Sequence, residues 1–506
     1  MKYLKILLSL SILMVLTACN LDENPPFLDD SVYDSPQSAR ATLDGIYESL
    51  TTYNAQERRL FVVNGFSGLF VTRKNGGNNV NNVNNANLFS LKPVLDIDSE
   101  SLWGGLYQAI ARSNSAIQNV EVFDNPQTPD EMGFNDLAGH AYFMRAWSYF
   151  SLVRLWGDIP LWLELPSSGN VDKAKSPTKE IYAQIMSDAQ QAANLMNGTS
   201  GSGYPQAYAA NMLLAKVYMT LATAPADLQD AGLDYWQLAY DQAIQGYGMY
   251  ELHNDYAELF TLAGENSSES IFELQISQDA ANSQMGRNYT PWKYKAAQHF
   301  GWFSVHADVF DYHLATYPED TIRRGATYLH GYDRADNGAT VRVYPSNPSR
   351  NAFNNAHPYL FKFAEKDKSH SNQYNSQNII VYRYAELLLM LAEISNELQN
   401  GEQLGYVTQV LSRAGLSPQA GYVGNQDAFR DAIMDEYRFE LIGEGEDAHN
   451  NRRRGFEYLL AHTILRHNNN PNFDSNVDLT LSTDEAEVMS LPIPLSEINT
   501  NQLIND

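Results

Sequence analysis

Apolar and aromatic residues recur every three or four positions along much of the 506-residue chain. Residues 97–120 carry such a face, and residues 136–155 place Phe143, Trp147 and Phe150 at helical spacing. This periodicity is typical of amphipathic helices whose apolar faces are buried. Further helices with this pattern are expected over residues 178–196, 205–217, 236–247, 378–398 and 427–442. The sequence therefore predicts a mostly α-helical fold.

The expected helices are paired by short turns, with small residues at the contacts, which resembles tetratricopeptide-type stacking without its full repeat signature. Residues 277–376 differ because they are rich in Asn, Pro, Tyr and Gly and lack helical periodicity. That composition predicts long loops with short strands, and long loops in compact proteins usually carry function. We expect a helical scaffold over residues 36–275 and 378–445, with an irregular, ligand-facing half between them.

The N-terminal segment indicates export. An apolar run over residues 6–16 is too short to span a bilayer but suits the core of a secretory signal. It leads into Leu16-Thr17-Ala18-Cys19, which resembles a bacterial lipobox, and Cys19 is the chain's single cysteine. We predict a signal peptide over residues 1–18, lipidation at Cys19, a tether over 19–35 and one domain over 36–506. An ordinary signal peptide that happens to contain a cysteine is the alternative.

Charge and cysteine content narrow the possible partners and sources of stability. The chain has 34 Lys and Arg residues against 60 Asp and Glu, and a net charge of -26, which argues against binding nucleic acid. A single cysteine cannot form an intramolecular disulfide, so stability must come from burial. No second hydrophobic span follows the leader, so we expect the protein to be held at the membrane by its lipid alone.

Three long windows free of acidic residues lie in loop-rich territory: residues 58–95, 280–307 and 337–364. The first holds eight Asn residues among the thirteen from Asn75 to Asn87, a run that fits either a ligand-binding loop or a low-complexity segment. The second contains RNYTPWKYKAAQHFGWF, residues 287–303. If the three windows converge, the site is locally positive within a negative body, and the ligand is then expected to be anionic.

Residues 287–303 divide into two parts. For Phe300, Trp302 and Phe303 we favour packing of the loop onto the scaffold, because an amphipathic segment follows them. The residues before them combine aromatic rings, which stack on the C–H faces of sugars, with cationic and amide groups that bind hydroxyls. For Tyr289, Trp292 and Tyr294, exposure and packing are equally open. The predicted ligand-binding residues are Trp292, Tyr289, Tyr294, Lys293, Arg73, Asn75 and Tyr344.

Several segments together resemble the SusD/RagB family of surface lipoproteins. Each is weak alone, but their order and spacing run from the lipobox almost to the last residue. The segments that carry the resemblance are residues 103–114, RAWSYFSLVRLWGDIPL at 145–161, VYRYAELLLMLAEISNE at 381–397, Arg413-Ala414-Gly415-Leu416, EYRFEL at 436–441 with Gly445, and Pro492-Ile493-Pro494.

The resemblance implies a SusD-like fold, mostly α, with tetratricopeptide-like helix pairs and a loop-rich half. It also implies a non-catalytic protein that binds a polysaccharide or oligosaccharide and delivers it to a SusC-like TonB-dependent transporter. The implied location is the outer membrane of a Gram-negative bacterium, lipid-anchored and facing the exterior. A peptide-binding lipoprotein of the same fold, resembling RagB, is the alternative, and a glycoside hydrolase is the least favoured.

Residues that suggest other chemistry have simpler explanations. Glu386, Glu393 and Glu397 share one flank of an expected helix with Arg383, and we interpret them as a solvated, salt-bridged face. Asp333, Asp336 and Asn337 before Gly338 miss the spacing of a calcium loop and predict a polar turn. Neither a G-x-S-x-G nor an H-E-x-x-H motif occurs. We therefore predict no catalytic residue, cofactor or metal site.

Overall fold

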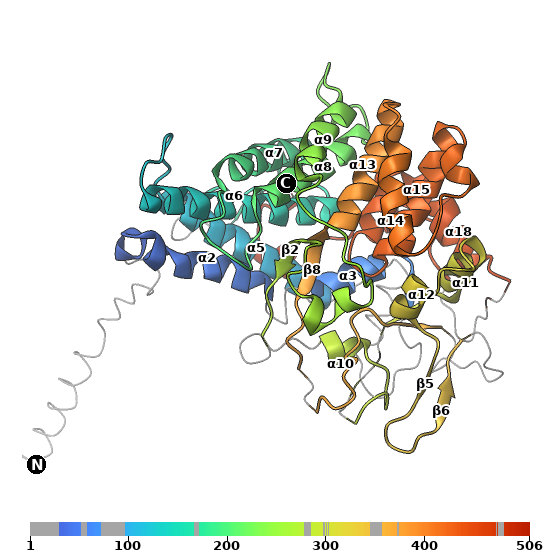
Figure 1. Ribbon diagram of the computed structural model, residues 1–506. Helices are drawn as coiled ribbons and strands as arrows, with labels where there is room; N and C mark the ends of the chain where they lie inside the picture. The colour runs from blue at the N-terminus through green and yellow to red at the C-terminus, as the bar shows by residue number, and fades with distance from the viewer. Residues whose placement is uncertain are drawn as a thin grey trace, which may run out of the picture.

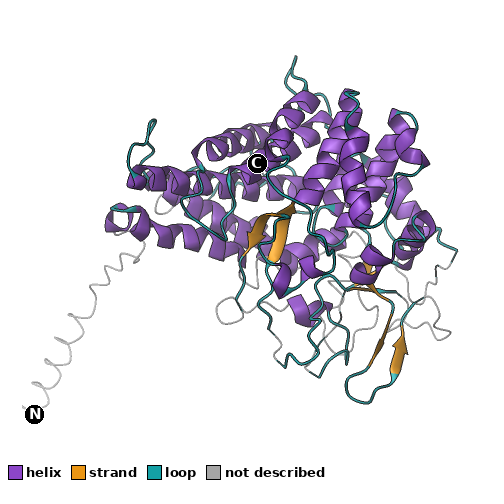
Figure 2. Cartoon of the chain, in the orientation of Figure 1, coloured by secondary structure: helices purple, strands orange, loops and turns teal. Residues whose placement is uncertain are grey.

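Helices dominate the computed structural model (Figures 1 and 2). The structure describes residues 30–51, 58–71, 97–165, 172–277, 285–296, 299, 301, 303–344, 357–371, 374–471, 473 and 480–505. The longer helices are α2 Pro36–Thr51, α3 Arg58–Phe66, α5 Ile97–Asn119, α6 Pro129–Trp156, α7 Thr178–Leu195, α8 Ala207–Ala222, α9 Tyr235–Ala243, α11 Ala307–Thr316, α13 Tyr384–Leu398, α14 Gln403–Arg413 and α15 Gln426–Leu441. The shorter ones are α10 Met285–Tyr289, α12 Thr321–Thr327, α16 Asp447–Arg453, α17 Phe456–Leu459, α18 Leu465–Asn468, α19 Glu485–Val488 and α20 Leu495–Thr500.

The strands are short and antiparallel. One sheet has the order β1-β3-β7-β4, and two further pairs are β2 with β8 and β5 with β6. Their bounds are β1 Phe70–Val71, β2 Ser270–Leu274, β3 Ser304–Val305, β4 Tyr328–Leu329, β5 Gly331–Asp333, β6 Thr340–Arg342, β7 Tyr359–Leu360 and β8 Ile379–Arg383. The mostly α fold with short strands is confirmed.

Consecutive helices pack side by side, so α6 contacts both α5 and α7, and α8 contacts both α7 and α9. Local sequence defines α6 well. Thr128 accepts a hydrogen bond from the Glu131 backbone N–H, and the Glu131 carboxylate accepts one from the Thr128 N–H. This capping box, with Pro129 at the first turn, starts the helix, and Gly157 ends it with a φ of 73°. The predicted stripe of Phe143, Trp147 and Phe150 is buried as expected.

The helix predicted over residues 378–398 is partly wrong, because its first residues form a strand. Residues 379–383 are β8, which pairs with β2 beside the helical layer, and α13 begins only at Tyr384 (Figure 1). The β-branched residues Ile379, Ile380 and Val381 favour a strand, and pairing with β2 decides the outcome.

The charged flank of α13 is salt-bridged as expected, but Glu386 and Glu393 are buried, so its interpretation as a solvated face is wrong for these two residues. Glu386 is 4% exposed and Glu393 is 0% exposed. Each is paired with a buried cation: Glu386 with Lys216, and Glu393 with Arg453 at 2.6 Å. Burial raises the pKa of Glu386 to about 7, although Lys216 opposes the shift. These carboxylates belong to the ion pairs that join the helical layers.

Asp447 links folding stability to pH. It lies at the start of α16, is buried, and accepts a hydrogen bond from the Gly443 backbone N–H at 3.1 Å. Burial raises the pKa of Asp447 to about 7, although the Gly443 N–H opposes the shift. Below about pH 4 both folded and unfolded chains hold this proton, whereas between pH 4 and 7 only the folded chain does. The stability that this proton contributes is therefore lost as the pH rises towards 7.

Replacing Asp447 with Asn is expected to remove that pH dependence. From pH 4 to pH 7 the free energy of unfolding of the wild type should fall, relative to that of Asp447→Asn, by on the order of 2–4 kcal/mol. Urea denaturation of both proteins at the two pH values measures the difference. Equal slopes against pH would show that the carboxyl is not protonated in the folded chain.

Candidate functional site

The loop after α10 is fastened to the β5–β6 hairpin, and both lie in the loop-rich part of the molecule, on the side away from α8 and α9 (Figure 1). The Tyr332 hydroxyl donates a hydrogen bond to the Trp292 carbonyl at 2.9 Å, and the Ala335 N–H donates one to the Lys293 carbonyl at 2.8 Å. Lys293 has a φ of 65°, in the left-handed region of the backbone that residues other than Gly rarely adopt. The two bonds hold this strained turn in place.

Gly301 packs closely against Pro291 of the same loop. Its φ is 54°, and a Cβ atom there would lie 2.8 Å from the Pro291 Cα atom. Only glycine fits this close approach without displacing the backbone before Trp292. The loop is thus set by its backbone contacts on two sides.

Trp292 projects from this turn and is 45% exposed. The Arg334 guanidinium carbon lies 4.9 Å from its ring centroid, and the Lys293 Nζ lies 5.2 Å from it. Asp336 pairs with both cations, at 2.6 Å from Arg334 and 3.4 Å from Lys293. The hydrogen bond from Arg334 holds the pKa of Asp336 below its ordinary value. We call Trp292, Lys293, Tyr332, Arg334 and Asp336 the Trp292 surface.

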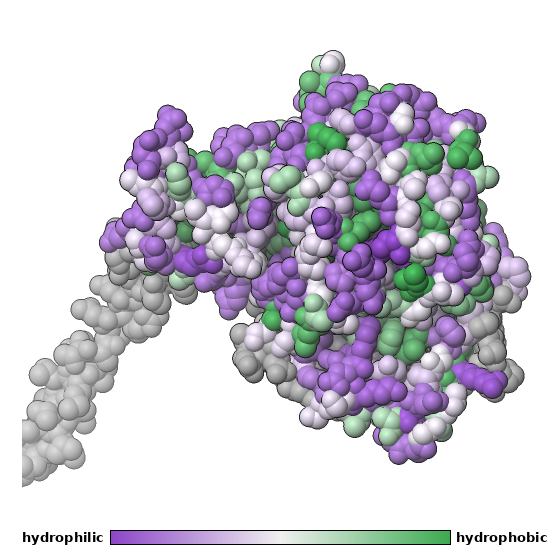
Figure 3. All heavy atoms as spheres, in the orientation of Figure 1, coloured by the Kyte–Doolittle hydropathy of each residue, from purple (hydrophilic) through white to green (hydrophobic). Residues whose placement is uncertain are grey.

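The Trp292 surface combines an exposed indole ring with two cations and one acid, all solvent-accessible to some degree. In the orientation of Figure 3, hydrophobic side chains are dispersed among hydrophilic ones over the visible face. An aromatic ring surrounded by hydrogen-bonding groups can stack on an apolar ligand face while its neighbours bind the ligand's polar edge.

The other predicted ring platforms are buried. Tyr289 is 0% exposed and stacks on Phe303, with ring centroids 4.7 Å apart, so we correct its role from platform to support. Tyr294 is 9% exposed and its ring contacts Tyr332 and Phe361 edge to face. Apolar ring area at the base of a loop is more stable out of water, which explains both placements.

Tyr344 is also unavailable as a polar contact. It is 5% exposed, and its hydroxyl donates to the Asp311 carboxylate at 2.5 Å. Phe303 is 2% exposed, which confirms that it roots the loop in the core. The remaining predicted residues, Arg73, Asn75, Phe300, Trp302 and Cys19, lie outside the described residues. Convergence of the three acid-free windows therefore stays a prediction.

Arg334, Asp336 and Tyr332 belong to the Trp292 surface, and the sequence prediction did not include them. Residues 333–338 were correctly interpreted as a polar turn: Asp333 accepts a hydrogen bond from Thr340, and Asn337 accepts one from the Ala339 N–H. The signal for a hairpin was present, because Gly338 follows Asp336-Asn337 and has a φ of 71°. What the sequence did not indicate was that this hairpin meets the Trp292 loop.

A cavity of about 510 Å³ adjoins the Trp292 loop. Its wall includes residues 364–367, and this segment is joined to the loop by Glu365 N–H to Thr290 Oγ1 at 2.7 Å and by Lys295 Nζ to the Asp367 carbonyl at 3.1 Å. Its other lining residues are Phe260, Thr261, Leu262, Ala263, His370, Ser376 and Gln377. Burial lowers the pKa of Lys366, in its wall, to about 8. Polar and apolar groups thus line the recess together.

A second cavity of about 430 Å³ lies by the helical scaffold, with His140, Tyr204, Tyr250 and Phe272 among its lining residues. Side chains of metal-ligand type also gather elsewhere, where His306, Asp308 and His467 are buried together. None of these residues was singled out from the sequence.

Comparison with known proteins assigns the chain to a protein family. A family model described as the SusD family matches residues 229–506, and a second model, described as starch-binding associating with outer membrane, matches residues 21–219. The chain belongs to the SusD family. The resemblance inferred from the sequence motifs is therefore confirmed. No described helix of this SusD family member is both long and apolar enough to cross a membrane.

Some relatives of this SusD family member match along almost its whole length. SusD-like protein P2 of Formosa agariphila is 25% identical over 97% of this chain and 98% of its own. A solved SusD homolog from Bacteroides thetaiotaomicron has a TM-score of 0.76 at 19% identity, covering 93% of this chain and 96% of the homolog. A structure described as a laminarin-binding SusD-like protein has a TM-score of 0.71 at 21% identity, covering 92% and 98%. These structural likenesses confirm the SusD-like fold.

Proposed function

We propose that this SusD family member binds a polysaccharide or oligosaccharide at the cell surface, without cleaving it, and passes it to a SusC-like TonB-dependent transporter. The observation that carries the proposal is the exposed ring of Trp292, held on a fastened loop between Lys293 and Arg334. Family membership supports a glycan as the ligand, since one structural neighbour is described as laminarin-binding.

The Trp292 surface suits a sugar for physical reasons. One face of a pyranose ring presents C–H groups that pack on an indole plane, while its hydroxyls need donors and acceptors at the edge. Arg334 and Lys293 supply donors, and Asp336 supplies an acceptor. The hydrogen bonds that the Tyr332 hydroxyl and the Ala335 N–H donate to loop carbonyls order the turn before binding, which lowers the entropic cost of binding.

The ligand is proposed to be anionic, such as a uronate-bearing or sulfated glycan. The Trp292 surface carries two cations against one acid, in a chain of net charge -26. A local excess of positive charge attracts an acidic polymer, and salt screens that attraction. Raising the salt from 50 to 500 mM is expected to weaken binding of an anionic glycan several-fold and to leave binding of a neutral one nearly unchanged.

The proposed lipid anchor is inferred from the N-terminal motif, and the proposed transporter partner is inferred from membership of the SusD family. Lipid on Cys19 would hold the protein on the outer face of the outer membrane of a Gram-negative bacterium. Mass spectrometry of the membrane-extracted protein tests the lipid. Purification of the lipidated protein in mild detergent tests the partner, because a large outer-membrane barrel is expected to copurify with it.

Affinity electrophoresis tests the ligand class. Residues 20–506, the predicted mature chain without its lipid-bearing cysteine, are run through gels that contain neutral or anionic polysaccharides, and peptides are tested by calorimetry. Retardation by a glycan supports the proposal. Binding of peptides alone would favour the RagB-like alternative, and release of shorter sugars during incubation would favour a glycoside hydrolase.

A further inference from the structure

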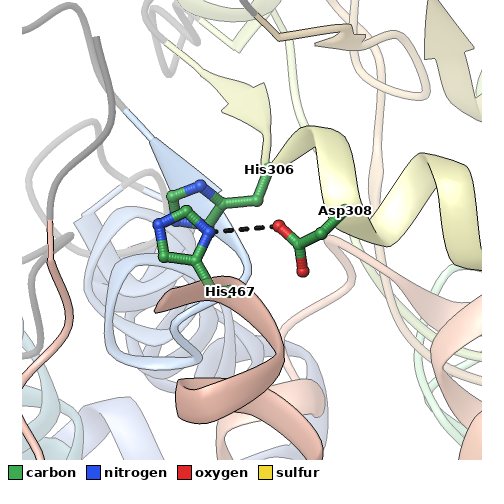
Figure 4. Close-up of side chains that lie close together, drawn as sticks. All are labelled: His306, Asp308 and His467. Carbon is green, nitrogen blue, oxygen red and sulfur yellow. Dashed lines mark hydrogen bonds and ion pairs between the residues drawn. The ribbon is translucent and has the colours of Figure 1, made fainter. Parts of the chain in front are cut away.

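His306, Asp308 and His467 bring three buried metal-ligand groups together from two distant parts of the chain (Figure 4). His306 and Asp308 lie at the start of α11, and His467 lies on α18. Their ligand atoms are within 4.8 Å of one another, and His306, Asp308 and His467 are 1%, 7% and 3% exposed, respectively. Burial of this kind removes water as a competing partner, so each polar atom needs another one.

His306 lacks such a partner. Neither of its ring nitrogens forms a hydrogen bond with any described residue, although the ring is almost fully buried. Its backbone is fixed, since its N–H donates to the Leu69 carbonyl at 2.9 Å and its carbonyl accepts from the Val309 N–H at 3.0 Å. A buried imidazole on a fixed backbone with unused nitrogens is a feature that calls for a ligand.

The other two groups are already spaced as ligands of one ion. The His467 Nδ1 and Asp308 Oδ1 atoms are 3.1 Å apart, and Figure 4 shows them facing each other with the His306 ring beside that of His467. Two atoms bound at about 2.0–2.1 Å to a tetrahedral ion are separated by roughly 3.3 Å. Binding would draw the His306 ring inward, from a ligand-atom separation of at most 4.8 Å.

We propose that His306, Asp308 and His467 bind a divalent transition-metal ion, of which Zn²⁺ fits best. Two imidazoles and one carboxylate are typical Zn²⁺ ligands, whereas Ca²⁺ and Mg²⁺ take oxygen ligands. His357, nearby, is not a ligand through Nδ1, because that atom accepts the Ala307 N–H at 3.1 Å. The ion would link α11, in the loop-rich half, to α18. Asp308 and His467, which lie on these two helices, are 159 residues apart in the sequence.

Metal binding to residues 20–506 tests the site, using Zn²⁺ and its spectroscopic substitute Co²⁺ as probes after dialysis against a chelator. The wild type is expected to retain one equivalent of Zn²⁺, to unfold at a higher temperature with it, and to give tetrahedral Co²⁺ absorption. His306→Gln is expected to lower Zn²⁺ affinity at least about 100-fold. Asp308→Asn, which keeps the side-chain volume, should lower it as well.

His313→Gln is the matched control. His313 forms a buried pair with Asp320, Nε2 to Oδ2 at 2.9 Å, but it lies outside the three-residue group. The His313→Gln variant should therefore bind Zn²⁺ with the affinity of the wild type. Wild-type protein that binds no Zn²⁺, binds it no better than His306→Gln, or binds Ca²⁺ in its place would overturn the proposal. The Co²⁺ spectrum needs no variant, so the test stands even if a substitution prevents folding.

Discussion

Replacing Arg383 with Met is expected to lower the free energy of unfolding by about 3–5 kcal/mol, because buried carboxylates lose their counter-ion. Arg383 is 1% exposed at the junction of β8 and α13. Its guanidinium pairs with Glu444 at 2.7 Å, Glu269 at 2.8 Å and Glu440 at 2.6 Å. It thus joins the two-stranded β2–β8 pair to α15 and to the segment that follows α15.

The neighbouring charges cannot compensate for that loss. Burial alone would raise the pKa of Glu440, but Arg413, Arg383 and Arg323 together hold it well below its ordinary value. Removing one of these three cations from a buried cluster leaves negative charge in a medium that stabilises it poorly. Part of the cluster would have to become protonated or hydrated, and either change costs stability.

Urea denaturation of Arg383→Met measures the loss, with Lys179→Met as the matched control. Lys179 pairs with Asp230 at 3.0 Å, but the two side chains are 46% and 54% exposed. An exposed pair of this kind contributes at most about 1 kcal/mol. If Arg383→Met lost no more than the control, the ion cluster would not be the stabilising junction that its geometry indicates.

Replacing Trp292 with Ala is expected to weaken glycan binding roughly 30-fold, equivalent to about 2 kcal/mol, the size typical of a central aromatic contact. Trp292 is 45% exposed and its backbone is fastened through its carbonyl, so truncation should leave the fold intact. Calorimetry and circular dichroism of the variant separate lost binding from lost structure. This prediction rests on the proposed function.

Tyr247→Ala is the control for that experiment. Tyr247 is 41% exposed, follows α9 on the helical scaffold, and contacts Tyr406 edge to face. It is an exposed ring of similar accessibility in another part of the molecule, so its removal should not change glycan affinity. An equal loss in both variants would indicate a general effect on the protein rather than a site at Trp292.

Helical periodicity predicted most of the scaffold, because a buried face leaves a repeating mark in the sequence. The boundary at Tyr384 was missed, since apolar and aromatic residues continue on both sides of it and the strand depends on a partner more than a hundred residues away. The buried state of Glu386 and Glu393 was missed for the same reason. Their cations, Lys216 and Arg453, come from distant segments, and only the fold brings them close.

The candidate site was partly predictable. Local composition identified the loop and selected Trp292, but it could not separate an exposed ring from a buried one: Tyr289 and Trp292 are three residues apart and have opposite environments. The backbone turn at Lys293 and the stacking of Tyr289 on Phe303 decide which ring meets solvent. The placement of Arg334 and Asp336 beside Trp292 and Lys293, and of His306 beside His467, depends on contacts between segments that no local pattern encodes.

Calorimetric titration of residues 20–506 with neutral glycans, anionic glycans and peptides, run in parallel on the wild type and Trp292→Ala, tests the central claim most directly. The proposed function predicts saturable binding of a glycan by the wild type, with an anionic one preferred, and a loss of roughly 30-fold in the variant. Binding of peptides but of no glycan, or full glycan affinity in Trp292→Ala, would contradict it.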